Sequence, residues 1–204
     1  MEWYEADVRE LETARAQHAA PKDPVVFYGS STIRLWDGLA EDLGDPRALN
    51  LGFGGSTLEA CAFFFERLVP PVDPCSLVVY AGDNDLGDGH SAQDVLAFFR
   101  ALATKVERDL NGIEFAFISV KPSPARFHII ERIRTANSLI REDIEARERG
   151  YFIDVFEAML GRDGKPQSSL FNADGLHMSA AGYRLWAQLL SAHKNRIFTL
   201  NCSS

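Results

Sequence analysis

The sequence lacks the features that mark several large classes of protein. None of its 204 residues falls in an apolar run of membrane-spanning length, so we expect no membrane insertion. Basic residues number 21 against 29 acidic ones, which gives a net charge of −8. Nucleic acids and anionic lipid surfaces attract basic faces, so we expect no nucleic acid as a partner. The first residues, Met1–Glu5, lack the basic start and apolar core of a signal peptide, which predicts a cytoplasmic protein.

Cysteine is scarce, and its spacing matches no familiar framework. The three cysteines, Cys61, Cys75 and Cys202, are an odd number without metal-ligand spacing. We expect reduced thiols, two of them buried and Cys202 on a loose tail.

Two short motifs begin like ligand-binding loops but miss the required spacing. Asp83, Asp85 and Asp88 start like a calcium loop, yet the remaining ligand positions do not fit. The glycines within 52–55 start a dinucleotide-binding pattern, Gly-x-Gly-x-x-Gly, which fails at Thr57. The sequence therefore predicts no metal and no cofactor.

The sequence does contain the alternation of strands and helices that is typical of an α/β protein. Apolar content of 46% over this length predicts one domain, 1–204, with a sizeable core. Short apolar runs predict strands, and segments with helical spacing between them predict helices. The expected strands are 25–28, 48–51, 76–81, 113–120 and 151–155. The expected helices are 2–20, 58–68, one from Ser91, 127–150 and one from Ser179. We expect a short helix or an irregular crossover at 33–43 and a tail at 198–204. This order implies a three-layer α/β/α sandwich around a five-stranded parallel sheet, a flavodoxin-like fold, with the N-terminal helix packed on it.

Polar residues gather where the expected strands end. The run Val25–Thr32 predicts a buried strand, a tight turn and a helix start, with Ser31 at the carboxyl end of the strand. Similar polar segments lie at 50–55, 82–85 and 174–177. The carboxyl ends of parallel strands meet at one edge of a sheet, so these segments can converge there. A serine at a helix start is also a preferred N-cap, which is the alternative interpretation.

The residues in these segments fit the needs of acyl transfer. Ser31 can act as the nucleophile, His177 as the base, and Asp174 as the group that holds the imidazole tautomer. The backbone N–H groups of Ser31 and Gly55 and the side-chain amide of Asn84 can bind a developing oxyanion.

Four other histidines are rival bases. Two of them, His18 and His193, lie on amphipathic helices and are expected at the surface or in packing contacts. His90 and His128 follow an expected polar segment and an expected strand, so a place in the pocket stays open for either.

The spacing of these residues resembles the SGNH hydrolases, also called the GDSL esterases and lipases. Gly29-Ser30-Ser31 matches the Gly-Asp-Ser motif, and 50–55 matches Asn-x-Gly-x-x-Gly. In the same order, 82–85 matches Gly-x-Asn-Asp, and 174–177 matches Asp-x-x-His. Within the family the chain is most similar to the branch with platelet-activating-factor acetylhydrolase-like esterases. The resemblance implies a serine hydrolase of carboxylic esters that works through a Ser-His-Asp triad and an acyl-enzyme.

The chain departs from the family pattern at two positions. Ser30 replaces the usual aspartate, which is no triad member, and Asp83 replaces the commoner threonine. We expect Asp83 near the substrate, and Phe53 and Trp36 as walls of a shallow pocket. A carboxylate at the cleft mouth and the lack of an obvious lid favour a short-chain, uncharged acyl ester as the small-molecule substrate. An acyltransferase with the same triad, or a non-catalytic small-molecule binding module on the same fold, are the alternatives, and a homodimer stays open.

Overall fold

A parallel sheet lies at the centre of the computed structural model, which describes residues 1–110 and 112–198. Within this part of the chain the sheet has five strands in the order β2-β1-β3-β4-β5, and every neighbouring pair is parallel. This is the flavodoxin-like strand order, and it confirms the predicted fold class. The strands are β1 (Val25–Gly29), β2 (Ala48–Gly52), β3 (Ser76–Tyr80), β4 (Glu114–Ile118) and β5 (Gly150–Ile153).

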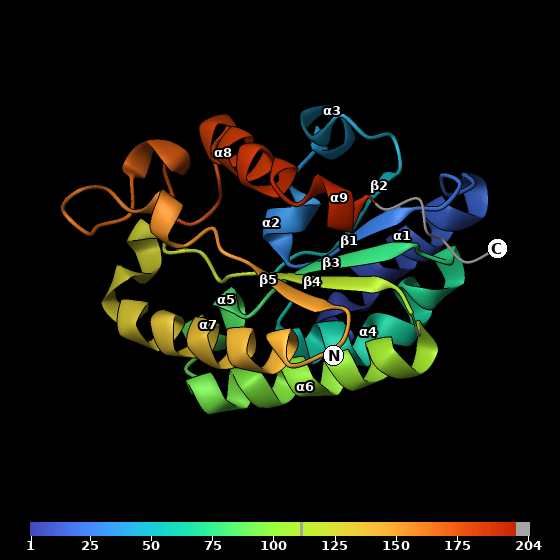
Figure 1. Cartoon of the computed structure of the whole chain (residues 1–204), viewed down its shortest axis with the longest axis horizontal. Helices are drawn as coiled ribbons and strands as arrows, with labels where there is room; N and C mark the ends of the chain where they lie inside the picture. Colours follow the sequence, from blue (N-terminus) through green and yellow to red (C-terminus); the bar gives the residue numbers. More distant parts are fainter. Residues whose placement is uncertain (111, 199–204) are drawn as a thin grey trace.

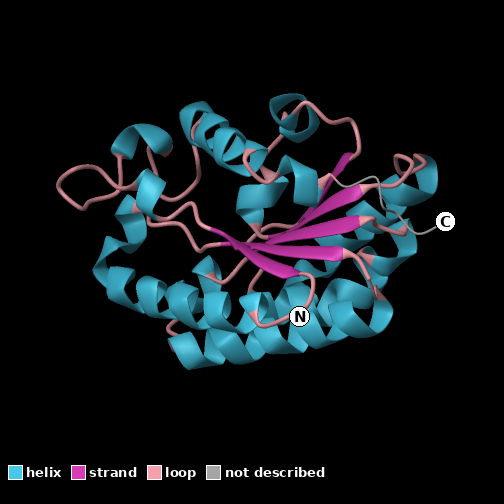
Figure 2. Ribbon diagram, viewed as in Figure 1, coloured by secondary structure: helices cyan, strands magenta, loops and turns pink. Residues whose placement is uncertain are grey.

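Helices cover both faces of the sheet (Figures 1 and 2). One layer contains α1 (Glu5–Gln17), α4 (Leu58–Leu68), α6 (Ala92–Asp109) and α7 (Ile130–Glu145). The other contains α2 (Ser31–Arg34), α3 (Leu39–Leu43), α8 (Ala180–Ser191) and α9 (Lys194–Ile197). The helix α5 (Asp83–Gly87) follows β3, and the short 3-10 helices are η1 (Glu2–Tyr4), η2 (Pro70–Val72), η3 (Pro124–Ile129), η4 (Glu157–Met159) and η5 (Ser168–Leu170).

The central strand β3 shows why the sheet needs two helical layers. Its side chains are buried on both faces, as the sequence predicts. Leu77 and Val79 pack into the core beneath α4, α6 and α7, whereas Val78 and Tyr80 pack into the core beneath α8. Strand side chains alternate between faces, so a strand apolar at every position must be covered on both.

The expected caps are present, and two expected elements differ in detail. Ser91 and Asp94 form a capping box at the start of α6, and the Ser179 hydroxyl caps α8. The segment 82–85, expected as a polar loop, enters the short helix α5. The helix expected from Phe127 instead starts at Ile130, because Pro124 opens a 3-10 helix before it.

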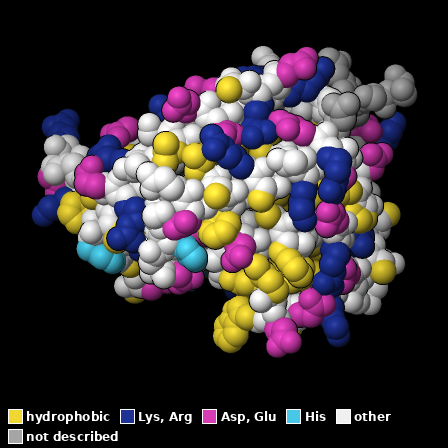
Figure 3. Space-filling view, turned by 90° about the horizontal axis from the view of Figure 1, so that it is seen from below, with side chains coloured by type: hydrophobic (Ala, Val, Ile, Leu, Met, Phe, Trp, Pro, Cys, Tyr) yellow, Lys and Arg dark blue, Asp and Glu magenta, His cyan; other side chains and the backbone are white. Residues whose placement is uncertain are grey.

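The surface carries charges of both signs, with hydrophobic side chains gathered over part of the face seen from below (Figure 3). No helix among residues 1–110 and 112–198 is long and apolar enough to cross a membrane. Cys61 and Cys75 are buried, as expected. Cys202 and residues 199–204 of the expected tail lie outside the described residues.

Candidate active site

A tight approach between two strands fixes the turn that presents Ser31. Gly29 ends β1 at a φ of +143°, and a Cβ at this position would lie 1.8 Å from the carbonyl oxygen of Tyr80 on β3. Only glycine therefore fits there. The Ser30 N–H then donates to the same Tyr80 oxygen at 3.0 Å, and Ser31 follows as the first residue of α2. Ser30 holds the N-cap position but its side chain makes no capping hydrogen bond, so capping does not account for this pair of serines.

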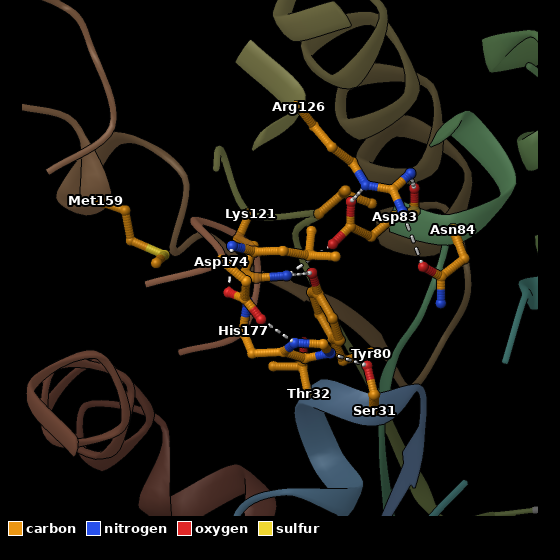
Figure 4. Close-up of polar contacts among 12 residues, drawn as sticks. Ser31, Thr32, Tyr80, Asp83, Asn84, Lys121, Arg126, Met159, Asp174 and His177 are labelled. Atoms are coloured by element: carbon orange, nitrogen blue, oxygen red, sulfur yellow. Dashed lines mark hydrogen bonds and ion pairs between the residues drawn. The ribbon is translucent and has the colours of Figure 1, made fainter. Parts of the chain in front are cut away.

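Ser31, His177 and Asp174 form a continuous chain of polar contacts (Figure 4). The Ser31 Oγ lies 3.2 Å from His177 Nε2, although the two residues are 146 positions apart. The other ring nitrogen, Nδ1, lies 2.7 Å from Asp174 Oδ2. A carboxylate next to Nδ1 favours the tautomer with its proton there, which leaves Nε2 as the acceptor for the serine hydroxyl.

The Asp174 carboxylate is held in place by its own loop. Its Oδ1 accepts hydrogen bonds from the backbone N–H groups of Leu176 (2.9 Å) and His177 (3.0 Å). The Leu176 N–H and the His177 ring, in that order, lower the pKa of Asp174 to about 2. The side chains of Asp174 and His177 are 47% and 31% exposed, so this pair lies at the protein surface.

The rival histidines do not take the place of His177. Among the described residues, His177 is the histidine that contacts the Ser31 hydroxyl. His90 packs edge-on against the Phe98 ring at 5.4 Å, and His193 stacks on Tyr151. His128 is exposed on η3.

The three N–H groups predicted as oxyanion donors have no partner among the described residues. These are the backbone N–H groups of Ser31 and Gly55 and one of the two N–H bonds of the Asn84 amide. The other Asn84 N–H donates to the Ser56 carbonyl at 3.1 Å. Figure 4 places the Asn84 amide nitrogen on the side of that residue toward Ser31, with the oxygen toward Arg126. An oxyanion hole requires N–H donors that are free to bind the substrate oxygen.

Residues of η1 and α1 hold the loop that carries Gly55. The Asp7 carboxylate accepts a hydrogen bond from the Gly54 N–H at 2.8 Å, and the Tyr4 hydroxyl donates to the Gly55 carbonyl at 3.3 Å. These contacts fix the Phe53–Gly54 and Gly55–Ser56 peptide groups, which flank the Gly54–Gly55 peptide. The Gly55 N–H between them is left free.

Comparison with known proteins identifies the family of the chain. A model of the GDSL-like lipase/acylhydrolase family matches residues 16–185. The chain belongs to this family. Membership supports ester hydrolysis in general as the activity of this protein. Sequence comparison with functionally curated proteins gives no match.

Solved structures of other proteins share the fold of this chain. One from Streptococcus pneumonia, whose name refers to platelet activating factor, has 21% identity and a TM-score of 0.81, with 94% of each chain covered. A GDSL-like lipase from Bacteroides thetaiotaomicron has 21% identity and a TM-score of 0.78, covering 92% of this chain and 97% of the other. An acylhydrolase from Bacteroides fragilis has 18% identity and a TM-score of 0.80, covering 93% and 96%.

A buried ionic cluster lies next to Asn84. The Asp83 carboxylate contacts the Lys121 ammonium at 2.7 Å and the Arg126 guanidinium at 3.2 Å. Lys121, whose side chain is only 1% exposed, also donates to the Tyr80 hydroxyl at 3.1 Å. Burial alone lowers the pKa of Lys121, but Asp83 and Tyr80 raise it above its ordinary value, so the ammonium stays charged. Sequence analysis missed Lys121 and Arg126.

The placement of the carboxylates corrects the expectation about the cleft mouth. Asp83 is 4% exposed and lies between two cations, so it offers no free negative charge to a substrate. Asp85 is fully buried and accepts the Leu58 N–H at the start of α4. Both carboxylates are structural, because a buried charge needs a partner or a helix N-terminus. Asp83 and Asp85 therefore bring no free charge to a cleft mouth, whereas Asp88, the third acidic residue of this segment, is exposed.

The two aromatic residues expected to wall a pocket are core residues. Phe53 is 0% exposed and packs against Tyr4, Tyr28 and Phe64, whereas Trp36 is 1% exposed and packs in the other core. The Trp36 indole N–H donates to Asp42. Neither side chain offers surface to a ligand in this structure, and neither enters the proposal below.

Proposed function

We propose that this acylhydrolase cleaves short-chain carboxylic esters through an acyl-enzyme on Ser31, with His177 as the base and Asp174 as its partner. The observation that carries the proposal is the polar chain from Ser31 through His177 to Asp174. Three residue types in this order are the arrangement that activates a serine for acyl transfer.

In the first half of the proposed reaction, Ser31 Oγ attacks the ester carbonyl carbon. His177 Nε2 takes the hydroxyl proton, and the Asp174 carboxylate stabilises the imidazolium that forms. The carbonyl oxygen gains a negative charge, for which the Ser31 and Gly55 N–H groups and the Asn84 amide are the proposed donors. The tetrahedral centre collapses, the C–O bond to the alcohol breaks, and the imidazolium returns its proton to the leaving alkoxide.

In the second half, water releases the acid. His177 Nε2 takes a proton from water, whose oxygen attacks the acyl carbon, and the same donors bind the second oxyanion. The bond to Ser31 Oγ then breaks, and Oγ takes the proton from the imidazolium. An acyltransferase differs only in the nucleophile of this half, an alcohol in place of water.

The preference for a short acyl group rests on the exposure of the site. Asp174 and His177 lie at the surface, and the aromatic side chains near the motifs are packed into the cores. A long acyl chain gains binding energy only where apolar walls remove it from water. The proposed site therefore suits an acetyl or butyryl group.

The test is a series of p-nitrophenyl esters from acetate to palmitate, assayed for release of p-nitrophenol. We expect the highest kcat/KM at acetate or butyrate and no turnover by Ser31→Ala. Ser30→Ala is the matched control, because it removes the neighbouring hydroxyl and should remain active. Activity that survives in Ser31→Ala and disappears in Ser30→Ala would overturn the assignment.

Product analysis separates the two acyl acceptors. With added alcohols, an acyltransferase would form new esters in place of the free acid, whereas the proposed hydrolase forms the acid as the main product. A kcat/KM higher for palmitate than for acetate would contradict the short-chain proposal.

A further inference from the structure

All three nitrogens of the Arg126 guanidinium contact two consecutive residues of α5. Nη2 donates to the Asn84 side-chain oxygen at 3.1 Å, and Nη1 donates to the Asp83 backbone oxygen at 2.6 Å. Nε lies 3.2 Å from the Asp83 carboxylate. A planar guanidinium with several fixed donors holds its partners in one geometry more strictly than a single ammonium does.

Gly87 makes room for this guanidinium. A Cβ at Gly87 would lie 1.1 Å from Arg126 Nη1, inside the volume that the guanidinium fills. Gly87 is a residue of α5 and does not lie in the left-handed region, so its backbone conformation does not require glycine. The requirement comes from the arginine, and the chain thus keeps a space open for Arg126 beside Asn84.

The orientation of the Asn84 amide decides whether this side chain can donate a hydrogen bond to an oxyanion. An asparagine amide can turn by half a rotation and exchange its oxygen with its nitrogen. With the nitrogen toward Ser31, it can donate to an oxyanion; with the oxygen there, it would repel one. A cationic donor at the oxygen makes the second orientation costly, because the guanidinium would then face an amide N–H.

We infer that Arg126 is a positioning residue that locks the Asn84 amide with its N–H bonds toward the oxyanion. This inference rests on the proposed function, in which Asn84 is an oxyanion donor. The guanidinium also withdraws charge from the amide oxygen, which makes the free N–H a stronger donor.

Arg126 is itself anchored from two sides. The Asp83–Lys121 pair holds its Nε side within a buried cluster. On the other side, the neighbouring Ala125 N–H donates to the Gly175 carbonyl at 3.0 Å, in the loop that carries Asp174 and His177. One short segment therefore links the loop of the proposed base with the proposed oxyanion donor.

Gly87→Ala tests the inference without a change of charge. The methyl group displaces the guanidinium from Asn84, and Arg126→Gln removes it altogether. For both variants we expect kcat for p-nitrophenyl acetate to fall by about 10-fold to 100-fold with KM within about twofold, since the contact acts as charge develops on the substrate. Gly38→Ala, where the nearest atom to the added methyl is 3.7 Å away, and Arg132→Gln, whose contact with α5 is one hydrogen bond of 3.4 Å to a backbone oxygen, are the matched controls.

A double-mutant cycle decides whether Arg126 acts through Asn84. In an Asn84→Ala background, Gly87→Ala should change kcat by less than about twofold, because the amide to be positioned is gone. An equal loss in both backgrounds would mean that Gly87→Ala acts by general disruption, and the inference would be wrong. Unchanged kcat in both Gly87→Ala and Arg126→Gln would also overturn it, while hydrolysis by the unaltered protein would still support the proposed function.

The amide itself gives a readout that does not depend on turnover. The side-chain N–H signals of Asn84 can be assigned in an NMR spectrum by their loss in Asn84→Ala. Displacement of Arg126 should shift these two signals in Gly87→Ala and leave them in place in Gly38→Ala. Signals that stay unchanged in Gly87→Ala would overturn the inference even if the protein hydrolysed no ester at all.

Discussion

The two sides of the candidate site are built in opposite ways. On the acid–base side, Asp174 and His177 are three residues apart on a partly exposed loop, and they contact each other and their own backbone. On the oxyanion side, Asp83 contacts Lys121 and Arg126 across separations of 38 and 43 residues, in a buried cluster. The contacts on the acid–base side join residues that are close in sequence and partly exposed, whereas those on the oxyanion side join residues that are far apart in sequence and buried.

Because of this difference, substitutions on the two sides should affect activity and stability unequally. Exposed hydrogen bonds contribute little to the free energy of unfolding, so the acid–base side can be altered with little effect on folding. Buried charges lose much of their stabilisation when one partner is removed, so the oxyanion side should respond in both properties. The predictions below follow from this contrast.

The largest effect is expected on the acid–base side, and only in activity. Ser31→Ala and His177→Ala should each lower kcat by about 10⁴-fold to 10⁶-fold, since the triad acts as a unit. The melting temperature should change by no more than about 2 °C, because both side chains lie at least partly at the surface. Ester hydrolysis and thermal unfolding of the same samples check both statements. A large fall in melting temperature would show that the loop is structural.

On the oxyanion side, Lys121→Met should destabilise the fold. It leaves the Asp83 carboxylate buried with Arg126 as its remaining cation, which we expect to lower the free energy of unfolding by about 3–5 kcal/mol. Urea unfolding measures the loss.

The matched variant for Lys121→Met is the double substitution Lys121→Met with Asp83→Leu, which removes both charges. It should recover part of the lost stability, because no carboxylate is then left buried without Lys121. If the single substitution unfolds at the same urea concentration as the unaltered protein, the cluster contributes no stability and the contrast fails.

Asn84→Ala should affect turnover more than folding. Loss of one oxyanion donor costs about 2.7–4 kcal/mol of transition-state stabilisation, or about 10²-fold to 10³-fold in kcat. KM should change little, since the donor acts only as charge develops. Steady-state kinetics measure the split. A normal kcat would remove Asn84 from the proposed mechanism.

Protonation of Asp174 should not limit activity above about pH 4. The pKa of Asp174 is lowered from 3.8 to about 2, so its bond to the imidazole is present above its ordinary pKa and is lost only as the pH falls toward 2. The profile of kcat/KM against pH should therefore show no ionisation near about pH 4. An ionisation at that pH would contradict this assignment of Asp174.

The smallest effect is expected from helix α1. Asp7→Ala removes the acceptor for the Gly54 N–H and should lower kcat by about threefold to tenfold, because the neighbouring Gly55 donor becomes less well ordered. Glu10→Ala on the exposed face of the same helix is the control and should be neutral. Equal activity of both variants would show that Gly55 needs no support from α1.

The local side of the site could be predicted from the sequence, and the long-range side could not. Asp174 and His177 pair within one loop, and Ser31 follows a strand, so motif spacing and strand order suffice to bring them together. Lys121 and Arg126 belong to no motif, and only the fold places them beside Asp83. The one signal was Asp83 itself, because a carboxylate at a position where threonine is common predicts a cation nearby.

The prediction that Phe53 and Trp36 line a pocket was wrong for a related reason. Phe53 and Trp36 lie next to the motifs in sequence, but Phe53 follows β2 and packs into one core, and Trp36 follows α2 and packs into the core on the other side of the sheet. Proximity in sequence does not tell which side of a turn an aromatic ring occupies. The strands themselves were predicted within a few residues, since apolar runs of this length are typical of buried parallel strands.

The most direct test of the central claim is the mass of the protein during turnover. Samples quenched in acid while they hydrolyse p-nitrophenyl butyrate should contain a fraction heavier by one butyryl group, and peptide mapping should place that group on Ser31. The adduct should be absent in Ser31→Ala and should accumulate in variants that slow deacylation. An adduct on another residue, or labelling of Ser31→Ala equal to that of the unaltered protein, would contradict the account.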